Sequence, residues 1–162
     1  MNVRFHGVRG SIPVSGAQFA RTGGNTTCVV LESQGERLIL DGGTGLAALG
    51  QELGCTAIDT TVLFTHVHWD HIQGVPFFAP LFHPGSRIRF GGARTEWGGI
   101  EDSLRAQMRP PQFPVGLDAF AASLDFRDID PHQPLEIGPF SIHASEMTHP
   151  NGVLVYRVEA DG

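Results

Sequence analysis

The segment from His66 to His71, with the sequence HVHWDH, constrains this chain more than any other part of it. The segment holds three histidines and one carboxylate, and it follows the apolar run 61–64, which predicts a buried strand. Neutral imidazole and carboxylate are the ligands that zinc and related divalent metals prefer. In α/β proteins, functional side chains gather where strands end. The segment therefore predicts a metal site at the end of a strand.

The spacing inside this segment divides its ligands into two groups. In an extended chain, residues two apart point to the same side, so His66 and His68 can converge on one ion. Asp70 and His71 are adjacent, and a turn after the strand can bring both towards a second ion. Asp70 is also the candidate catalytic residue, because its carboxylate can orient a nucleophilic water. For Asp70 taken alone, the alternative is a helix N-cap for the segment that begins at His71.

His149 offers a third imidazole for the first ion. It follows a predicted strand and precedes Pro150-Asn151-Gly152, a turn that can aim its side chain rigidly. With His66 and His68 it would complete a tetrahedral site whose fourth position holds water. We expect zinc in one or two sites, although manganese and iron accept the same ligands.

These motifs resemble the signature of the metallo-β-lactamase-fold hydrolases, in the branch of phosphodiesterases and tRNase Z-like enzymes. The resemblance covers nearly all of the chain and rests on five segments: Gly7–Pro13, Gly23–Thr27, Leu40–Gly45, His66–Gly74 and Thr148–Pro150. It implies an α/β fold, an αβ/βα sandwich of two mixed sheets flanked by helices, with residues 1–162 as one domain.

The resemblance also implies that part of the domain is missing at the C-terminus. In the family, a later strand ends in an aspartate that bridges two metals, and a further histidine follows. Glu159 and Asp161 are the only later carboxylates here, and Asp161 with Gly162 suits a hairpin turn. We therefore expect the second half to be incomplete and the last predicted strand, 153–159, to have an unpaired edge. Such an edge favours self-association.

Asp41 ends another predicted strand and is followed by two glycines. A carboxylate in this place can orient a ligand histidine through its ring N–H. The alternative is a turn aspartate whose side chain hydrogen-bonds the local backbone.

The loop 109–116 is rich in proline and cannot continue the helix predicted before it. In an enzyme of this family such a loop would be a candidate lid. Arg109 would then hold an anion, and Phe113 would form a hydrophobic wall.

Composition limits the partners of the chain. Its formal net charge of −6 argues against an extended nucleic-acid surface, because neutralising phosphates requires clustered Lys and Arg. It leaves room for a small anionic substrate held directly by metal. No apolar run approaches a membrane span and no signal peptide is visible, so we expect no membrane partner. Cys28 and Cys55 are far apart and suit a reducing cytoplasm as buried small hydrophobes.

Together with the resemblance, these features predict a metal-dependent phosphodiesterase. It would cleave a small cyclic or linear phosphodiester through a metal-bound hydroxide. Thioester or lactone hydrolysis is an alternative within the enzymes. An alternative from another class is a catalytically inactive fragment that binds metal or a partner chain without turnover.

Overall fold

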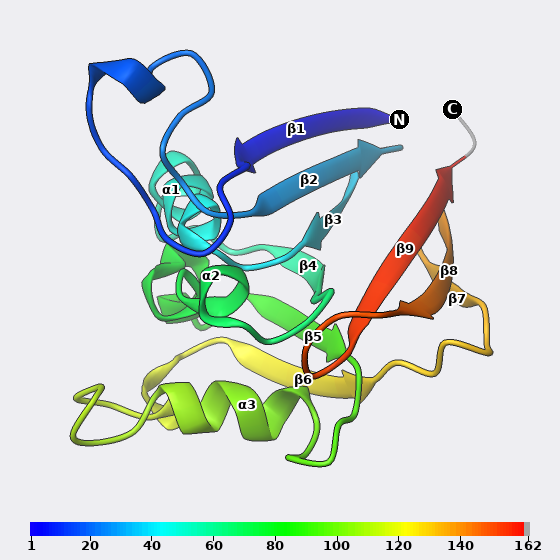
Figure 1. The fold of residues 1–162 in the computed structure, drawn as a ribbon. Coiled ribbons are helices and arrows are strands. Elements are labelled where there is room, and N and C mark those ends of the chain that lie inside the picture. The colour runs from blue at the N-terminus through cyan, green and yellow to red at the C-terminus, as the bar shows by residue number, and fades with distance from the viewer. Residues whose placement is uncertain (161–162) are drawn as a thin grey trace.

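The computed structural model describes residues 1–160, which form two β-sheets and three α-helices (Figure 1). The first sheet has six strands whose spatial order follows the sequence. Its strands are β1 (Asn2–Gly7), β2 (Cys28–Ser33), β3 (Glu36–Leu40), β4 (Asp59–Leu63), β5 (Arg87–Gly92) and β6 (Ser123–Asp128). β2 runs antiparallel to both of its neighbours, β1 and β3, and β3 to β6 are parallel, so this sheet is mixed.

The second sheet is a smaller antiparallel one, made of β7 (Leu135–Ile137), β8 (Phe140–Met147) and β9 (Val153–Ala160). The α-helices are α1 (Thr44–Leu53), α2 (Trp69–Ile72) and α3 (Ile100–Gln107). Single 3-10 turns connect the elements: η1 (Ala17–Phe19), η2 (Val75–Phe77), η3 (Ala79–Phe82) and η4 (Leu117–Ala119). The α/β class and the layered sheets confirm the predicted architecture.

The middle of the first sheet is buried on both faces, and β4 shows this most directly. Val62 is fully buried among residues of the helices, including Leu46 of α1 and Leu104 of α3. Leu63, its neighbour, is buried on the other face against the second sheet, beside Phe140 of β8. Successive side chains of a strand point to opposite faces, so a strand buried on both faces needs an unbroken apolar run.

The parallel strands end at a common edge of the first sheet. Leu40 at the end of β3 is in register with Leu63 at the end of β4, and Asp41 N–H donates to the Leu63 carbonyl at 2.9 Å. The predicted strand, helix and turn positions here are close to the observed ones. In particular, α1 spans the predicted helix 44–53, and Gly54 caps it with a φ of 66°. The segment 65–71, which we call the metal segment, therefore begins beside Asp41.

The structure excludes one alternative considered for Asp70, and one expectation, the burial of Cys55, is wrong. The N-cap of α2 is His68, and Asp70 lies within the first turn of that helix, so Asp70 does not serve as an N-cap. Cys28 is buried as expected, but Cys55 is exposed. Cys55 follows the C-cap of α1 in a surface connection, where neither sheet covers it. Separately, residues 1–160 contain no helix with the length and apolar character that crossing a membrane requires.

Each sheet has two edge strands within residues 1–160, β1 and β6 in the first sheet and β7 and β9 in the second (Figure 1). Val3 and Phe5 of β1 pair with Leu31 and Val29, so they lie on the face that packs against the second sheet. Nevertheless Val3 is 46% exposed and Phe5 is 68% exposed. This uncovered apolar strip beside open backbone edges is the kind of surface that associates.

We predict that the chain self-associates through this strip and edge. Phe5→Lys places a charge on the strip and should shift the protein towards monomer, as measured by light scattering during size-exclusion chromatography. Val115→Lys is the control, because Val115 is equally a large exposed apolar residue, 44% exposed, but lies in the loop after α3. A monomeric wild-type chain at high micromolar concentration would contradict the prediction.

Candidate metal centre

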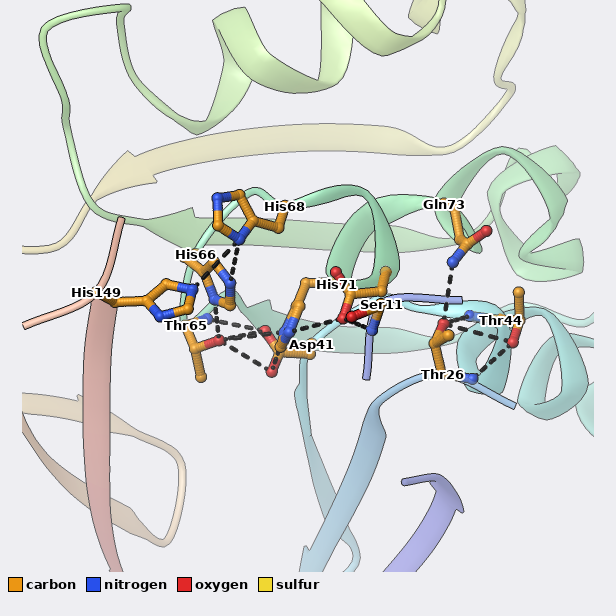
Figure 2. Close-up of polar contacts among 11 residues, drawn as sticks. Ser11, Thr26, Asp41, Thr44, Thr65, His66, His68, His71, Gln73 and His149 are labelled. Carbon is orange, nitrogen blue, oxygen red and sulfur yellow. Dashed lines mark hydrogen bonds and ion pairs between the residues drawn. The ribbon is translucent and has the colours of Figure 1, made fainter. Parts of the chain in front are cut away.

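Three histidines converge at the end of β4, as Figure 2 shows. His66 and His68 lie in the loop between β4 and α2, and His149 lies in the turn between β8 and β9. One ring nitrogen of each lies within 4.8 Å of the other two. His66 Nε2 is 3.1 Å from His68 Nδ1, and His149 Nε2 is 3.3 Å from the same atom. The structure thus brings together the predicted ligands of the first ion, which come from both sheets.

These separations fit a tetrahedral metal ion. With Zn–N bonds of about 2.0–2.1 Å, the ligand nitrogens of a tetrahedral site lie roughly 3.3 Å apart. The observed nitrogen distances of 3.1 and 3.3 Å match that edge. The ligating atoms would be Nε2 of His66, Nδ1 of His68 and Nε2 of His149. We refer to these three residues as the His triad.

The surroundings keep His66 neutral, as metal ligation requires. Burial, together with the neighbouring rings of His71, His68 and His149, lowers the pKa of His66 to about 4. Thr65 Oγ1 lies 3.0 Å from His66 Nδ1, the ring nitrogen that faces away from the other triad rings. The side-chain amide of Asn151 lies 3.3 Å from His68 Nε2. Contacts of this kind fix ring orientation and tautomer.

Asp70 and His71 form a second group beside the triad. Asp70 Oδ2 lies 3.5 Å from His71 Nε2, and the His71 ring centroid is 4.0 Å from that of His66. Asp70 is only 8% exposed, and the backbone N–H of Ser11 donates to its Oδ2 at 2.7 Å. The adjacent carboxylate and imidazole are compatible with the predicted second ion.

Asp41 holds the metal segment from below through both carboxylate oxygens (Figure 2). Oδ1 accepts the Thr65 backbone N–H at 2.8 Å and faces the Thr65 hydroxyl at 3.1 Å. Oδ2 lies 2.9 Å from His71 Nδ1. Asp41 also has a φ of 62°, a left-handed conformation that Asp and Asn tolerate better than most residues. The expectation that Asp41 orients a ligand histidine agrees with this geometry.

The charge on Asp41 acts on His71. Burial alone lowers the pKa of His71, but the hydrogen bond to Asp41 and the negative charges of Asp41 and Asp70 outweigh it. The net effect raises the pKa of His71 above its ordinary value. His71 directs Nδ1, with its proton, to Asp41. The other ring nitrogen, Nε2, faces Asp70.

Glycines allow two loops of the site to meet backbone to backbone. Gly42 N–H donates to the His71 carbonyl at 2.7 Å, and Gly74 N–H donates to the Gly42 carbonyl at 2.8 Å. A Cβ on Gly74 would lie 1.9 Å from the Gly43 carbonyl oxygen, and one on Gly43 would lie 2.3 Å from the Asp70 carbonyl oxygen. Neither position has room for a side chain. Glycine at both positions therefore allows the loop of Asp41 and the loop of His71 to be in direct backbone contact.

Three contributors were not assigned a role from the sequence. Ser11 acts through its backbone N–H, and the only signal was the glycines near it, which permit close approach of the backbone. Thr65 stands inside the metal segment, and Asn151 stands inside the turn after His149, but neither side chain type signals a role alone. A second polar set joins the starts of β2 and α1 to the end of α2, through Thr26, Thr44 and Gln73 (Figure 2).

The structure does not support the lid hypothesis. The cavity beside the triad has neither Arg109 nor Phe113 in its lining. Phe113 packs against Phe77, with ring centroids 5.9 Å apart, and against the core beneath the helices. Arg109 is exposed. Phe113 is therefore a partly buried residue that packs against the core after the end of α3.

The comparison with protein families gives a clear assignment. The family described as "Metallo-beta-lactamase superfamily" matches residues 21–157 of this chain. This range includes the triad, Asp70 and His71. The chain therefore belongs to the metallo-beta-lactamase superfamily. This confirms the resemblance inferred from the motifs, and the fold of this superfamily implies divalent metal binding.

Sequence relatives fit the tRNase Z-like branch. Ribonuclease Z of Haloarcula marismortui is 25% identical over 164 residues, which cover 99% of this chain and 48% of the relative. Ribonuclease Z of Natronomonas pharaonis is 32% identical over 139 residues, covering 82% of this chain and 42% of the relative. The chain spans about half the length of the curated relatives that it matches.

Solved structures share the fold. The metallo-beta-lactamase fold protein YhfI from Bacillus subtilis superposes with a TM-score of 0.70 at 20% identity, covering 97% of this chain and 56% of that one. A diphosphatase from the PhnP family gives a TM-score of 0.70 at 17% identity, with 96% and 61% covered. The short form of human tRNase Z gives 0.66 at 18% identity, with 99% and 65% covered. These three structures are similar to this chain in fold.

Removing the Asp41 carboxylate should loosen the metal segment. Asp41→Ala leaves a buried backbone N–H and the His71 ring without their acceptor, which costs about 1–3 kcal/mol in the free energy of unfolding. Urea denaturation measures this cost. Asp125→Ala is the control, because Asp125 is an exposed residue of β6. Equal stability of the two variants would show that Asp41 does not hold the segment.

Adding one methyl group at Gly74 should have a similar cost. Gly74→Ala drives a Cβ into the Gly43 carbonyl, and we expect a loss of about 1–3 kcal/mol in urea denaturation. Gly10→Ala is the matched control, because a Cβ there has no neighbour within 4 Å in the described chain. A Gly74→Ala variant as stable as the Gly10→Ala variant would refute the close-packing explanation.

Proposed function

We propose that this chain carries the metal-binding centre of a phosphodiesterase that acts on a small cyclic or linear phosphodiester. The observation that carries the proposal is the convergence of the three triad nitrogens at metal-ligand spacing beside a buried carboxylate. Relatives named ribonuclease Z and a solved diphosphatase support phosphoester chemistry over β-lactam cleavage.

The residues for a metal ion are present. His66, His68 and His149 would hold a first ion, and Asp70 with His71 would hold a second. We propose zinc as the ion, because three neutral imidazoles at tetrahedral spacing suit it, and manganese or iron as substitutes. A bound divalent ion lowers the pKa of water and stabilises negative charge on a phosphoryl oxygen.

Asp70 is the proposed catalytic residue. Ser11 N–H fixes one of its carboxylate oxygens, Oδ2, so the group cannot turn freely. Among the described residues, Oδ1 has no hydrogen-bond partner. It can therefore accept a proton from a nucleophilic water and orient that water towards the phosphorus.

Charge and cysteine chemistry suggest the substrate and the compartment. A net charge of −6 favours a small anionic substrate over an extended nucleic-acid surface, although RNA is implied by the names of the relatives. Cys28 and Cys55 are both free thiols, which supports a reducing, cytoplasmic location.

A second candidate function is metal or partner binding without turnover. It is favoured by the ligand set itself. Within residues 1–160 the group of ligands around the triad contains no bridging carboxylate. Glu159 instead pairs with Arg157 on the exposed side of β9, and Asp161 lies outside the described residues.

Metal content and turnover together separate these candidates. We expect elemental analysis of the gently purified chain to find zinc, and bis(p-nitrophenyl) phosphate to be hydrolysed. His68→Ala removes the ligand nearest to both other triad nitrogens, so metal should be lost and turnover should fall at least about 100-fold. His143→Ala is the control, because His143 is an exposed histidine of β8.

The outcomes differ clearly. Two ions per chain with turnover lost only in His68→Ala would support the hydrolase. One ion and no turnover would favour the binding function. Retention of metal by His68→Ala at the wild-type level would refute the triad as the metal site.

A further inference from the structure

A cavity of about 590 Å³ opens directly beside the His triad. His66 and His68 form part of its lining with their neighbours in 64–68, and the other residues come from the region between the end of β5 and α3 and from the β8–β9 hairpin. Its size lies within the range of sites that bind small molecules. A substrate whose phosphate is held at the triad would extend into this cavity.

One side chain in the lining is a large exposed aromatic. Trp97 is 63% exposed, although burying an indole on folding is normally favourable. The turn that carries it is firmly tied: Thr95 N–H donates to the Gly98 carbonyl at 2.9 Å, and Gly98 N–H donates back at 3.1 Å. The backbone N–H of Trp97 donates to Thr95 Oγ1 at 3.2 Å. An indole held open by a fixed turn loses little conformational entropy when a ligand stacks on it.

The turn is also connected to the helix that follows. Gly99 N–H donates to Asp102 Oδ2 at 2.9 Å, a side-chain contact in the first turn of α3. Trp69 is the other tryptophan and is 73% exposed, but it is not in the lining of this cavity. Of the two tryptophans, Trp97 is therefore the one whose open indole lines this cavity.

Further apolar lining comes from the second sheet. Met147 ends β8, Val153 begins β9, and the two are directly paired across the hairpin. Met147 is 60% exposed. An indole, a polarizable thioether and a branched aliphatic group together suit a flat, neutral ring.

The charges around the cavity disfavour a second anionic group. Glu96 and Glu146 contribute two carboxylates to the lining. Arg94 is the one cation of the lining, and its Nε lies 2.6 Å from Asp128 Oδ2, which neutralises it. The phosphate of a substrate is therefore favoured at the triad, and the part that enters the cavity should be uncharged. The ring amines of a nucleobase can donate to such carboxylates.

We propose that Trp97 is the specificity-determining residue that stacks on the nucleobase of a nucleotide phosphodiester whose phosphate lies at the His triad. This proposal rests on the proposed phosphodiesterase function and deepens it. It assigns a substrate class, a small phosphodiester bearing a flat neutral base, to a cavity on one side of the metal centre.

The kinetic test compares two substrates with the same reacting group. Adenosine 2′,3′-cyclic phosphate and glycerol 1,2-cyclic phosphate share a five-membered cyclic diester, but only the first carries a base. Stacking on an aromatic side chain is worth about five- to hundredfold in binding, so Trp97→Ala should raise KM for the adenosine substrate by that factor. The KM for the glycerol substrate should not change, and Trp97→Phe should restore most of the loss.

An equal loss on both substrates would overturn the proposal, because a residue needed only for folding would affect both alike. No change on either substrate would overturn it as well. Hydrolysis measured by ³¹P NMR serves both substrates without a chromophoric leaving group that could itself stack on Trp97.

If the wild-type protein hydrolyses neither substrate, the proposed function is refuted. A binding measurement then still tests the stacking on Trp97. Adenosine 3′-phosphate added to the zinc-loaded chain should quench tryptophan fluorescence. Quenching that persists in Trp69→Phe and disappears in Trp97→Phe would support stacking on Trp97. Quenching that is absent in the wild type, or that disappears only in Trp69→Phe, would overturn it.

Discussion

The hydrogen bonds of Asp41 are the interaction on which the rest of the site depends. A single buried carboxylate at the end of β3 accepts the Thr65 backbone N–H at the end of β4 and faces the ring of His71. It therefore fixes the start and the end of the metal segment at once. Because the negative charge is buried, it is stabilised only while these donors are in place. The same contact raises the pKa of His71 and directs its Nδ1 away from Asp70.

The ligand set of the triad is divided between the two sheets, and this links metal binding to folding. His66 and His68 lie in the loop that follows β4 of the first sheet, whereas His149 lies in the turn of the β8–β9 hairpin of the second. The two sheets meet through a core that includes Leu63 and Phe140. A bound ion would therefore stabilise the packing of one sheet on the other, since ligands from both sheets contribute to its binding. β1 is one of the edge strands, and its Val3 and Phe5 remain exposed.

Much of the cavity beside the triad is lined by chain segments that have no motif. The turn that presents Trp97 is stabilised by its own hydrogen bonds and by Asp102 of α3. Its chemistry complements the triad: the histidines suit the charged group of a substrate, and the indole suits an uncharged ring. A division of this kind separates binding of the reacting group from recognition of the remainder.

The sequence by itself determined the local structure and the ligand types. The run before His66 predicted β4, the leucine spacing predicted α1, and the pattern HVHWDH predicted the metal segment, because strand and helix periodicities are local properties. Tertiary structure alone decided the remainder. The bond from Ser11 to Asp70, the burial of Phe113 and the place of Trp97 beside the triad join distant segments. Their side chains carry no periodic signal, so only the packing of sheets and loops could place them.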